Sequence, residues 1–419
     1  MTAALLELFP PGSAIDEDGT LVVGGCRLDA VAADFGTPVL VVAEDVLRQR
    51  ARDYLTAFRS RWTRTDIAFA SKSFPCTAVQ RVMVEEGCHL DVAGGGEIRT
   101  ALAAGADPSL LILHGNAKTD EEIELAVRHG VGVIVVDNFD DIDRLERLVP
   151  SGRVQPCLVR VIPGVEAATH ASVATGHAGS KFGLLPADAA VAIARIERSS
   201  VLRCDGLHTH VGSQLLNVEQ LAAAVAPLAK LGTFDVYDLG GGLGVRYTYA
   251  EHPPDLDAYA DAMIDQARAL LPADCRIIIE PGRSMVASSA CTVYRVTTIK
   301  RGVRTHVAVD GGMGDNLEVS LYGQRFEATI VDRLGGGEEV TVVGRHCESG
   351  DQLVDEVPLR DPVVGDLLAV PVTGAYCYTM SNQYNGARRI PVVFVADGDA
   401  RLVVRRDTWD DLLSRDVAR

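Results

Sequence analysis

The chain has 419 residues, of which 47% are hydrophobic, and its formal net charge is −17 at pH 7. This length exceeds what one core usually accommodates, so we expect two domains. The acidic balance argues against a nucleic-acid or anionic-membrane partner, because both require basic surface, although a local pocket can still take a small anion. No apolar run reaches the length of a transmembrane helix.

The nine cysteines include no C-x-x-C pair and no spacing typical of a metal site, so no metal is expected. An odd number of scattered cysteines is more typical of reduced thiols than of a disulfide framework. The N-terminal stretch is acidic and is interrupted by Pro10 and Pro11, unlike a secretory signal. The sequence therefore predicts a cytoplasmic protein.

Residues 38–290 alternate short β-rich runs with segments of helical periodicity. Segments such as 119–130 and 217–232 have apolar residues at helical spacing and glycine near the end. Eight strands, each followed by a helix, indicate an α/β fold, a (β/α)₈ barrel of the TIM type. A doubly wound open sheet is the alternative. The expected strands are 66–70, 89–93, 110–114, 132–137, 157–162, 206–211, 234–239 and 276–280.

The pattern changes after residue 290, where strand-like runs and turns predominate. This predicts a separate β domain over 291–419. Residues 1–37 contain similar runs, and we expect them to pack with that domain. The expected C-terminal strands lie within 292–301, 305–312, 327–334, 338–346, 366–372 and 390–406.

Polar side chains lie in or directly after the eight expected barrel strands. Each alone has an ordinary explanation, such as a helix cap, a satisfied core histidine or a lysine that reaches solvent. Barrel chemistry, however, occurs at the C-terminal ends of the strands, so their convergence on one rim predicts an active site. In strand order they are Lys72, Asp91, His114, Asp137, Arg160, His208 with His210, Gly240–Gly242 and Glu280.

Lys72 follows a buried run, which is a costly place for an ammonium without a partner. A lysine there can instead be deprotonated to form a Schiff base. Glycines 240–242 and the turn 280–284 follow strands seven and eight, the usual phosphate site of a barrel. A lysine, a phosphate cradle and a carboxylate together suggest pyridoxal 5′-phosphate, with Glu280 at the ring nitrogen and His210 against the ring face.

The motifs resemble those of the alanine-racemase-fold decarboxylases that use pyridoxal phosphate, and among them the diaminopimelate decarboxylases. The resemblance spans nearly the whole chain, and the order of GGGLG, EPGRS and CESGD makes it specific. The matching stretches are FASKS (69–73), LDVAGGGEIRTALAAG (90–105), LHGNAKTDEEI (113–123), RVIPGVEAATH (160–170), SKFG (180–183), GLHTHVGSQ (206–214), DLGGGLGVRY (238–247), EPGRSMVA (280–287), VDGGMGDN (309–316), LYGQRF (321–326), CESGD (347–351) and GAYCYTMSNQYN (374–385).

This resemblance implies a role for each matching position. Lys72 would carry the cofactor, and Cys347 would donate a proton to the carbanion that decarboxylation leaves. The family's shared active sites also imply a homodimer acting on an amino acid. The remaining implied cofactor residues are Asp91, His210, Ser213, Gly240, Gly241, Gly242, Glu280, Pro281, Gly282, Arg283 and Tyr376, and the implied substrate residues are Arg283, Glu318, Tyr322, Glu348 and Tyr376.

Three positions depart from the family pattern. Glu318, followed by Val319, stands where these decarboxylases usually have an arginine for the distal carboxylate of the substrate. Gly94 and Ile162 replace a serine and an asparagine, and both changes look tolerable. Glu318 reverses a charge, so we expect weak activity on meso-diaminopimelate and better activity on a substrate with a cationic or neutral distal end. Alternatively, Glu318 points to solvent and Arg325 replaces the missing arginine.

Three other functions remain open at this point. The chain could be a paralogous decarboxylase of another basic or secondary-pathway amino acid. It could be a cofactor-free regulator, although Lys72, the glycines and Cys347 are all present. It could also be an amino-acid racemase of the same fold, although racemases lack the CESGD motif.

Overall fold

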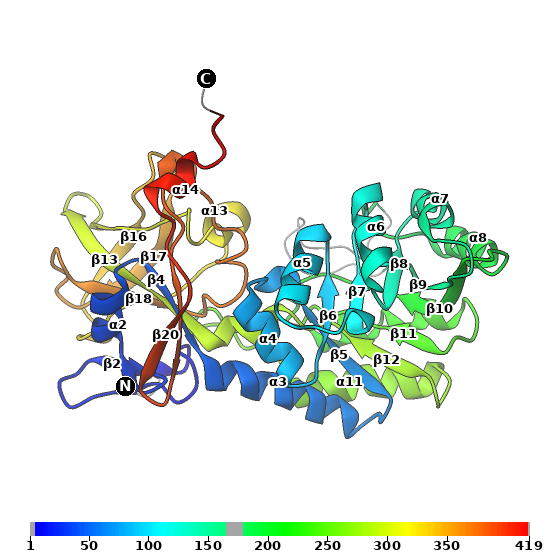
Figure 1. The fold of residues 1–419 in the computed structure, drawn as a ribbon. Helices are drawn as coiled ribbons and strands as arrows, with labels where there is room; N and C mark the ends of the chain where they lie inside the picture. Colours follow the sequence, from blue (N-terminus) through cyan, green and yellow to red (C-terminus); the bar gives the residue numbers. More distant parts are fainter. Residues whose placement is uncertain (1–4, 165–178, 418–419) are drawn as a thin grey trace. The chain divides into compact units, whose positions relative to one another are not determined.

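The computed structural model describes residues 5–164 and 179–417, and these fall into two compact units (Figure 1). The barrel unit comprises Arg50–Val245 and His252–Ser284. The β unit comprises Met1–Gln49, Arg246–Glu251 and Met285–Arg419. Part of the expected motif 160–170 lies outside the described residues. No helix in the described part of the chain is long and apolar enough to cross a membrane.

The barrel unit contains a closed ring of eight parallel strands, as the alternating sequence pattern predicts. Strand β12 pairs with β5, which closes the ring and excludes the open-sheet alternative. All eight strands overlap the expected runs. They are β5 (Thr65–Ala70), β6 (His89–Val92), β7 (Leu111–Leu113), β8 (Val133–Val136), β9 (Gln155–Arg160), β10 (Leu202–His208), β11 (Val236–Asp238) and β12 (Arg276–Ile279).

Small and branched apolar side chains from six of the eight barrel strands form one buried cluster of the barrel unit: Ala68, Ile112, Val135, Leu158, Val236 and Ile278. Such a layer makes the barrel a packed core rather than a pore, so its chemistry is confined to the strand ends. The helices that follow the strands along the chain are α4 (Thr77–Glu85), α5 (Gly95–Ala103), α6 (Asp120–His129), α7 (Phe139–Leu148), α8 (Pro186–Ile196), α9 (Val218–Ala222), α10 (Val225–Ala229) and α11 (Leu256–Leu270).

Local sequence signals explain how these helices begin and end. Thr119 and Glu122 form a capping box at the start of α6, and Gly130 ends the helix in the left-handed region at φ 81°. The single helix expected over 217–232 is instead two short helices, α9 and α10. Pro227 explains the interruption, because proline lacks the amide that would donate to the preceding turn.

The β unit is organised around a nine-stranded sheet in which the central strand β13 (Ala290–Lys300) pairs with β4, β14 and β18. A separate sheet contains β1 (Ala14–Ile15), β2 (Leu21–Val23) and β3 (Cys26–Arg27). The other strands of the large sheet are β4 (Val39–Ala43), β14 (His306–Val309), β15 (Thr329–Ile330), β16 (Glu338–Val343), β17 (Gln352–Leu359), β18 (Leu367–Pro371), β19 (Val392–Ala396) and β20 (Asp399–Val404).

Two features of the β unit differ from expectation. Residues 38–49 lie in it rather than in the barrel, because β4 pairs with both β13 and β19. Strand β17 was not expected, since charged residues and Pro358 weaken its strand signal. The remaining α-helices in the described part of the chain are α2 (Leu28–Phe35), α13 (Glu318–Tyr322) and α14 (Trp409–Leu413) in the β unit, and α3 (Glu44–Arg59) and α12 (Arg283–Val286), which contain unit boundaries.

Candidate active site

Lys72 lies in a short 3₁₀ turn, Ser71–Ser73, directly after β5. Its Nζ is 2.7 Å from Oδ2 of Asp91 in the neighbouring strand β6. The Asp91 side chain is buried, whereas that of Lys72 is 42% exposed. The second carboxylate oxygen of Asp91 is buried without a hydrogen-bond partner in the described part of the chain. An accessible ammonium therefore pairs with a buried carboxylate whose second oxygen can still accept a hydrogen bond.

Glu280 follows β12 and is buried between two imidazoles. His114 Nε2 lies 2.6 Å from Oε1 of Glu280, and His208 Nε2 lies 3.1 Å from Oε2. Burial alone would raise the pKa of the Glu280 carboxyl, but His114 and His208 hold this pKa well below its usual range. Burial also lowers the pKa of His208 to about 4, so its ring is neutral at pH 7. The ionised form of Glu280 is thus favoured by its position between the imidazoles of His114 and His208.

Asp238, at the end of β11, was not among the expected site residues. Its side chain is fully buried, and its carboxylate lies within 4.8 Å of the ligand atoms of His114, His208 and Glu280. Burial and then the charge of Glu280 raise the pKa of Asp238 well above its usual range, which favours the protonated form of this carboxyl. Its place two residues before the glycine run was the signal in the sequence, but a carboxyl at a strand end is usually only a helix cap, so it was not singled out.

The glycine run links Asp238 to the neighbouring strand ends. Gly240 N donates to Oδ1 of Asp238 at 3.0 Å, and Gly241 N donates to Nδ1 of His210 at 3.2 Å. A Cβ on Gly241 would lie 2.0 Å from the carbonyl oxygen of Glu280, so no larger residue fits there. Gly240 also has φ 68°, which favours glycine. The run therefore packs directly against the ends of the strands that carry the charged residues.

Further polar groups surround this loop. Arg283 Nε donates to Ser213 Oγ at 3.3 Å. Burial, followed by the charge of Lys72, holds the pKa of His210 well below its usual range. The ring is therefore neutral, and its Nδ1 is the unprotonated nitrogen because it accepts from Gly241. Asp91, His210, Ser213, the glycines and Glu280–Arg283 all lie in the barrel unit with Lys72.

Two other expected strand-end residues pair with each other. Arg160 Nη1 lies 3.5 Å from Oδ2 of Asp137, and the Arg160 guanidinium lies 4.5 Å from the ring centre of Phe182. Asp137 also accepts from Gly183 N at 2.9 Å. These contacts give Asp137 a role in holding the segment around Gly183.

The remaining expected residues lie in the β unit. Cys347 and Glu348 are exposed in the turn between β16 and β17. Helix α13 carries Glu318 and Tyr322, and Ser320 Oγ in this helix donates to Gly350 O at 2.9 Å. The helix is therefore tied to the turn that contains Cys347. Tyr376 is half-buried, with φ 63°.

The solvent-facing alternative for Glu318 is wrong. Glu318 is 1% exposed, and Tyr247 donates a hydrogen bond to its Oε2 at 3.3 Å. Arg325, the residue considered as a substitute for the missing arginine, is exposed. The sequence signals a glutamate at this position, but only the packing of α13 decides that the carboxylate is internal.

The barrel residues suit pyridoxal 5′-phosphate by their chemistry. An accessible lysine fits an aldehyde, and an anionic buried carboxylate fits a protonated ring nitrogen. A glycine loop beside an arginine and a serine fits a phosphate. The buried, unpartnered oxygen of Asp91 is a further acceptor for a bound polar group.

Comparison with known proteins agrees with this site. The family model described as "Pyridoxal-dependent decarboxylase, pyridoxal binding domain" matches residues 44–287. A diaminopimelate decarboxylase of Actinosynnema pretiosum subsp. auranticum is 44% identical, over 98% of this chain and 95% of that protein. The enzyme of that name from Bacillus subtilis (strain 168) is 39% identical, over 96% of each chain.

Solved structures show the same similarity. Diaminopimelate decarboxylase from M. jannaschii in co-complex with L-lysine has a TM-score of 0.92 and 27% identity, with 98% of each chain covered. The Helicobacter pylori enzyme complexed with L-lysine has a TM-score of 0.88 and 28% identity, with 93% of this chain and 98% of that chain covered. Together with the barrel and its rim of charged residues, these matches show that the chain belongs to the pyridoxal-dependent decarboxylases, which are carboxy-lyases with pyridoxal 5′-phosphate as cofactor.

Proposed function

We propose that this enzyme decarboxylates meso-diaminopimelate to L-lysine and CO₂. The observation that carries the proposal is the arrangement of Lys72, Asp91 and Glu280 at the ends of three barrel strands. It occurs in a chain that matches diaminopimelate decarboxylases over nearly its whole length. The substrate named for those enzymes, diaminopimelate, is an amino acid that carries a second amino group and a second carboxylate at its distal end.

The cofactor, when bound, supplies an electron sink for the electron pair that is released as CO₂ departs. Lys72 would hold its aldehyde carbon, because the ammonium is accessible while Asp91 keeps it oriented. Glu280 would keep a proton on the ring nitrogen, because its pKa is held low by the two imidazoles beside it. The other residues proposed to hold the ring and phosphate are Asp91, His210, Ser213, Gly240, Gly241, Gly242, Pro281, Gly282, Arg283 and Tyr376.

Proton delivery is assigned to Cys347. When the bond from the α-carbon to the carboxylate breaks, the electron pair stays with the α-carbon and must receive a proton. The Cys347 thiol would give that proton and regain one from water. Glu348 and Tyr322 lie near it in the β unit, on the same turn and on the helix tied to it. The residues proposed to contact substrate are Arg283, Glu318, Tyr322, Glu348 and Tyr376.

The enzyme is further proposed to act as a homodimer in the cytoplasm. Exposure of Cys347 and Glu348 on the β unit supports a role in a partner's active site. All nine cysteines are free thiols, which supports a reducing compartment.

Active sites shared between two subunits predict complementation between Lys72→Ala and Cys347→Ala. Hybrid dimers would contain one intact site, so an equimolar mixture should recover about a quarter of wild-type activity. No recovery would contradict shared sites.

Glu318 favours a second candidate substrate class. A buried carboxylate attracts a distal ammonium and repels a distal carboxylate, and both effects are stronger away from water. A diamino acid without the second carboxylate would therefore suit α13 better than meso-diaminopimelate does. Lysine and ornithine belong to this class, because each has a distal ammonium and only one carboxylate.

The test measures CO₂ release and product identity with purified enzyme and pyridoxal 5′-phosphate. The panel contains meso-diaminopimelate and both enantiomers of lysine, ornithine and arginine. The first proposal expects L-lysine from meso-diaminopimelate with the highest kcat/KM of the panel. A higher kcat/KM on lysine or ornithine would establish the second candidate. Release of CO₂ from no substrate would contradict both.

A further inference from the structure

The turn that carries Cys347 is built around a buried carboxylate. Asp351 is 3% exposed and ends the segment between β16 and β17. Its Oδ1 accepts from Met313 N at 2.6 Å. Its Oδ2 accepts from His346 N at 2.7 Å and lies 2.8 Å from His346 Nδ1. One carboxylate therefore links both ends of this turn to a segment 38 residues away in the sequence.

Glycines make room for the Asp351–His346 pair. A Cβ on Gly344 would lie 2.2 Å from Oδ2 of Asp351, and one on Gly312 would lie 2.5 Å from both of its oxygens. A Cβ on Gly314 would lie 2.8 Å from His346 Nε2. Real side chains do not approach this closely, so the backbone of two separate segments is shaped around the pair.

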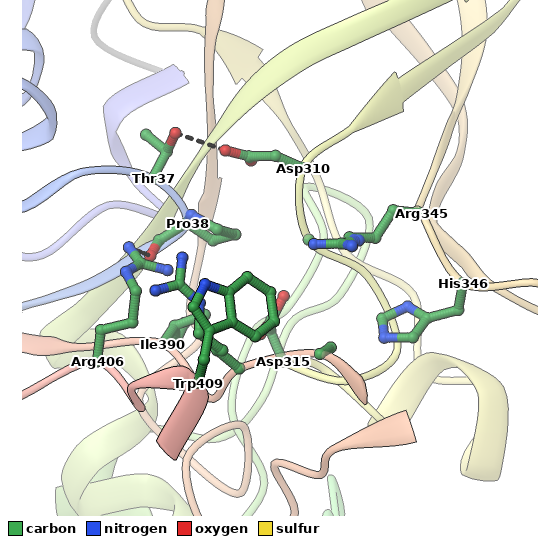
Figure 2. A pocket seen from close by; sticks show the side chains of 12 residues that line it. Thr37, Pro38, Asp310, Asp315, Arg345, His346, Ile390, Arg406 and Trp409 are labelled. Atoms are coloured by element: carbon green, nitrogen blue, oxygen red, sulfur yellow. Dashed lines mark hydrogen bonds between the residues drawn. The ribbon is translucent and has the colours of Figure 1, made fainter. Parts of the chain in front are cut away.

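The imidazole of His346 is held by both hydrogen bonding and packing. His346 stacks on Tyr384, with ring centres 5.9 Å apart and planes 5° apart. It also lines a cavity of about 240 Å³ in the β unit, where Figure 2 shows it with Arg345 and Asp315. The His346 side chain is only 2% exposed, so the contacts with Asp351 on one edge and Tyr384 on one face fix its position.

A second contact holds Cys347 itself. Cys347 N donates to Oδ1 of Asn385 at 2.7 Å. Asn385 has φ 53° and ψ 26°, a left-handed conformation that non-glycine residues adopt at a cost. The Cys347 backbone is thus fixed by two contacts: its own amide donates to Asn385, and the preceding residue, His346, is held by Asp351. Cys347 is nevertheless the one exposed cysteine of the nine.

A buried aspartate in a turn is often only structural, because it satisfies local amides. Here the carboxylate also takes an amide from a distant segment and an imidazole directly beside an exposed thiol. We propose that Asp351, through His346, and Asn385 are positioning residues that hold the Cys347 thiol where it delivers its proton. The inference rests on the proposed role of Cys347.

The experiment compares Asp351→Asn, His346→Ala and His346→Asn with wild type, and uses Asp355→Asn as the matched control. Asp355 lies on the same strand β17, with a side chain 46% exposed. In Asp351→Asn one oxygen becomes an amide, which cannot accept from Met313 or His346. The Nδ2 of asparagine in His346→Asn stands in for the Nδ1 donor of histidine, so that variant should retain part of the function.

Positioning predicts a specific set of results. Asp351→Asn should lower kcat roughly 10- to 100-fold and change KM less than threefold, which is the lower part of what a positioned acid contributes. The absorbance of bound cofactor should stay unchanged. More of the cofactor should be converted to its amine form during turnover, because protons reach the wrong carbon. The rate of Cys347 alkylation by iodoacetamide, followed by peptide mass spectrometry, should change at least threefold. Asp355→Asn should match wild type.

A double-mutant cycle separates positioning from general stability. In a Cys347→Ala background, Asp351→Asn should lower kcat less than twofold further, because no thiol remains to be positioned. An equal loss in both backgrounds would overturn the inference, as would unchanged kcat, product partition and alkylation in Asp351→Asn. If Cys347→Ala alone leaves turnover unchanged, the proposed role of the thiol fails instead, and the alkylation rates still report whether Asp351 holds the turn.

Discussion

Tyr247 donates a hydrogen bond to Oε2 of Glu318 at 3.3 Å, inside the β unit and across 71 residues of sequence. The contact keeps a carboxylate buried on α13, where the resemblance to diaminopimelate decarboxylases calls for an arginine. A buried carboxylate is costly unless its oxygens are satisfied. Tyr247 contributes one such contact to the Glu318 carboxylate, and the pair defines the first test.

Glu318→Gln should lower kcat/KM roughly 10- to 100-fold for substrates with a distal ammonium, because the side chain that attracts the ammonium loses its negative charge. Tyr247→Phe serves as the control, since it removes the tyrosine hydroxyl but keeps the carboxylate. It should lower thermal stability more than kcat/KM. Steady-state kinetics on the same substrate panel checks both variants, and equal kinetic effects would show that the pair is only structural.

Lys72→Ala should abolish turnover and the absorbance band of lysine-bound cofactor near the boundary of the visible and ultraviolet ranges. Lys230→Ala is the control, because that lysine is exposed and follows α10. It should leave the spectrum unchanged. Ultraviolet–visible spectra of the purified proteins measure this directly, and a fully active Lys72→Ala enzyme would contradict the proposed site.

Cys347→Ala should lower turnover roughly 10²–10⁴-fold, the usual contribution of a positioned acid. Bound cofactor should remain, since the residues proposed to hold it include no cysteine. Cys204→Ala, a half-buried barrel thiol, is the matched control. Single-turnover kinetics with product analysis checks the prediction, and an unaltered product ratio together with an unaltered rate would leave Cys347 as a packing residue.

The difference in stability between Asp238→Asn and wild type should shift in favour of Asp238→Asn as the pH rises from 4 to 8. The pKa of Asp238 is raised in the folded protein by burial and by Glu280, whereas the unfolded carboxyl titrates near pH 4. The folded state therefore binds more protons above pH 4, and wild-type stability falls with rising pH over this range. Asparagine does not titrate, and it mimics the neutral acid.

Thermal midpoints of wild type and Asp238→Asn across this pH range provide the measurement. Asp235→Asn is the control, because its side chain is 70% exposed and lies three residues earlier in the same segment. Its difference from wild type should not depend on pH in the same way. A constant difference for Asp238→Asn would mean that Asp238 is ionised in the folded protein.

Periodicity and motif order are enough to predict the barrel and the order of its site residues along the chain. Strand and helix periodicities are local signals, and eight repeats of strand and helix leave few other folds. In a parallel barrel the strand ends share one rim, so Lys72, Asp91 and Glu280 could be assigned to it before any distance was known. The clear failures were also local: β17 has a weak strand pattern, and Pro227 divides an expected helix.

The distribution of charge and hydrogen bonds among these residues depends on contacts between segments that are far apart in the chain. Two histidines, from β10 and the end of β7, lower the pKa of Glu280, whereas burial and the charge of Glu280 raise the pKa of Asp238. A sequence cannot rank two buried carboxyls that differ only in their neighbours. Strand β4 belongs to the β unit because it pairs with β13 and β19. Both partners lie hundreds of residues away in the sequence, so no local pattern near β4 indicates this pairing. The burial of Glu318 and the Asp351–His346 contact are likewise decided by packing between distant segments, which leaves no periodic trace in the chain.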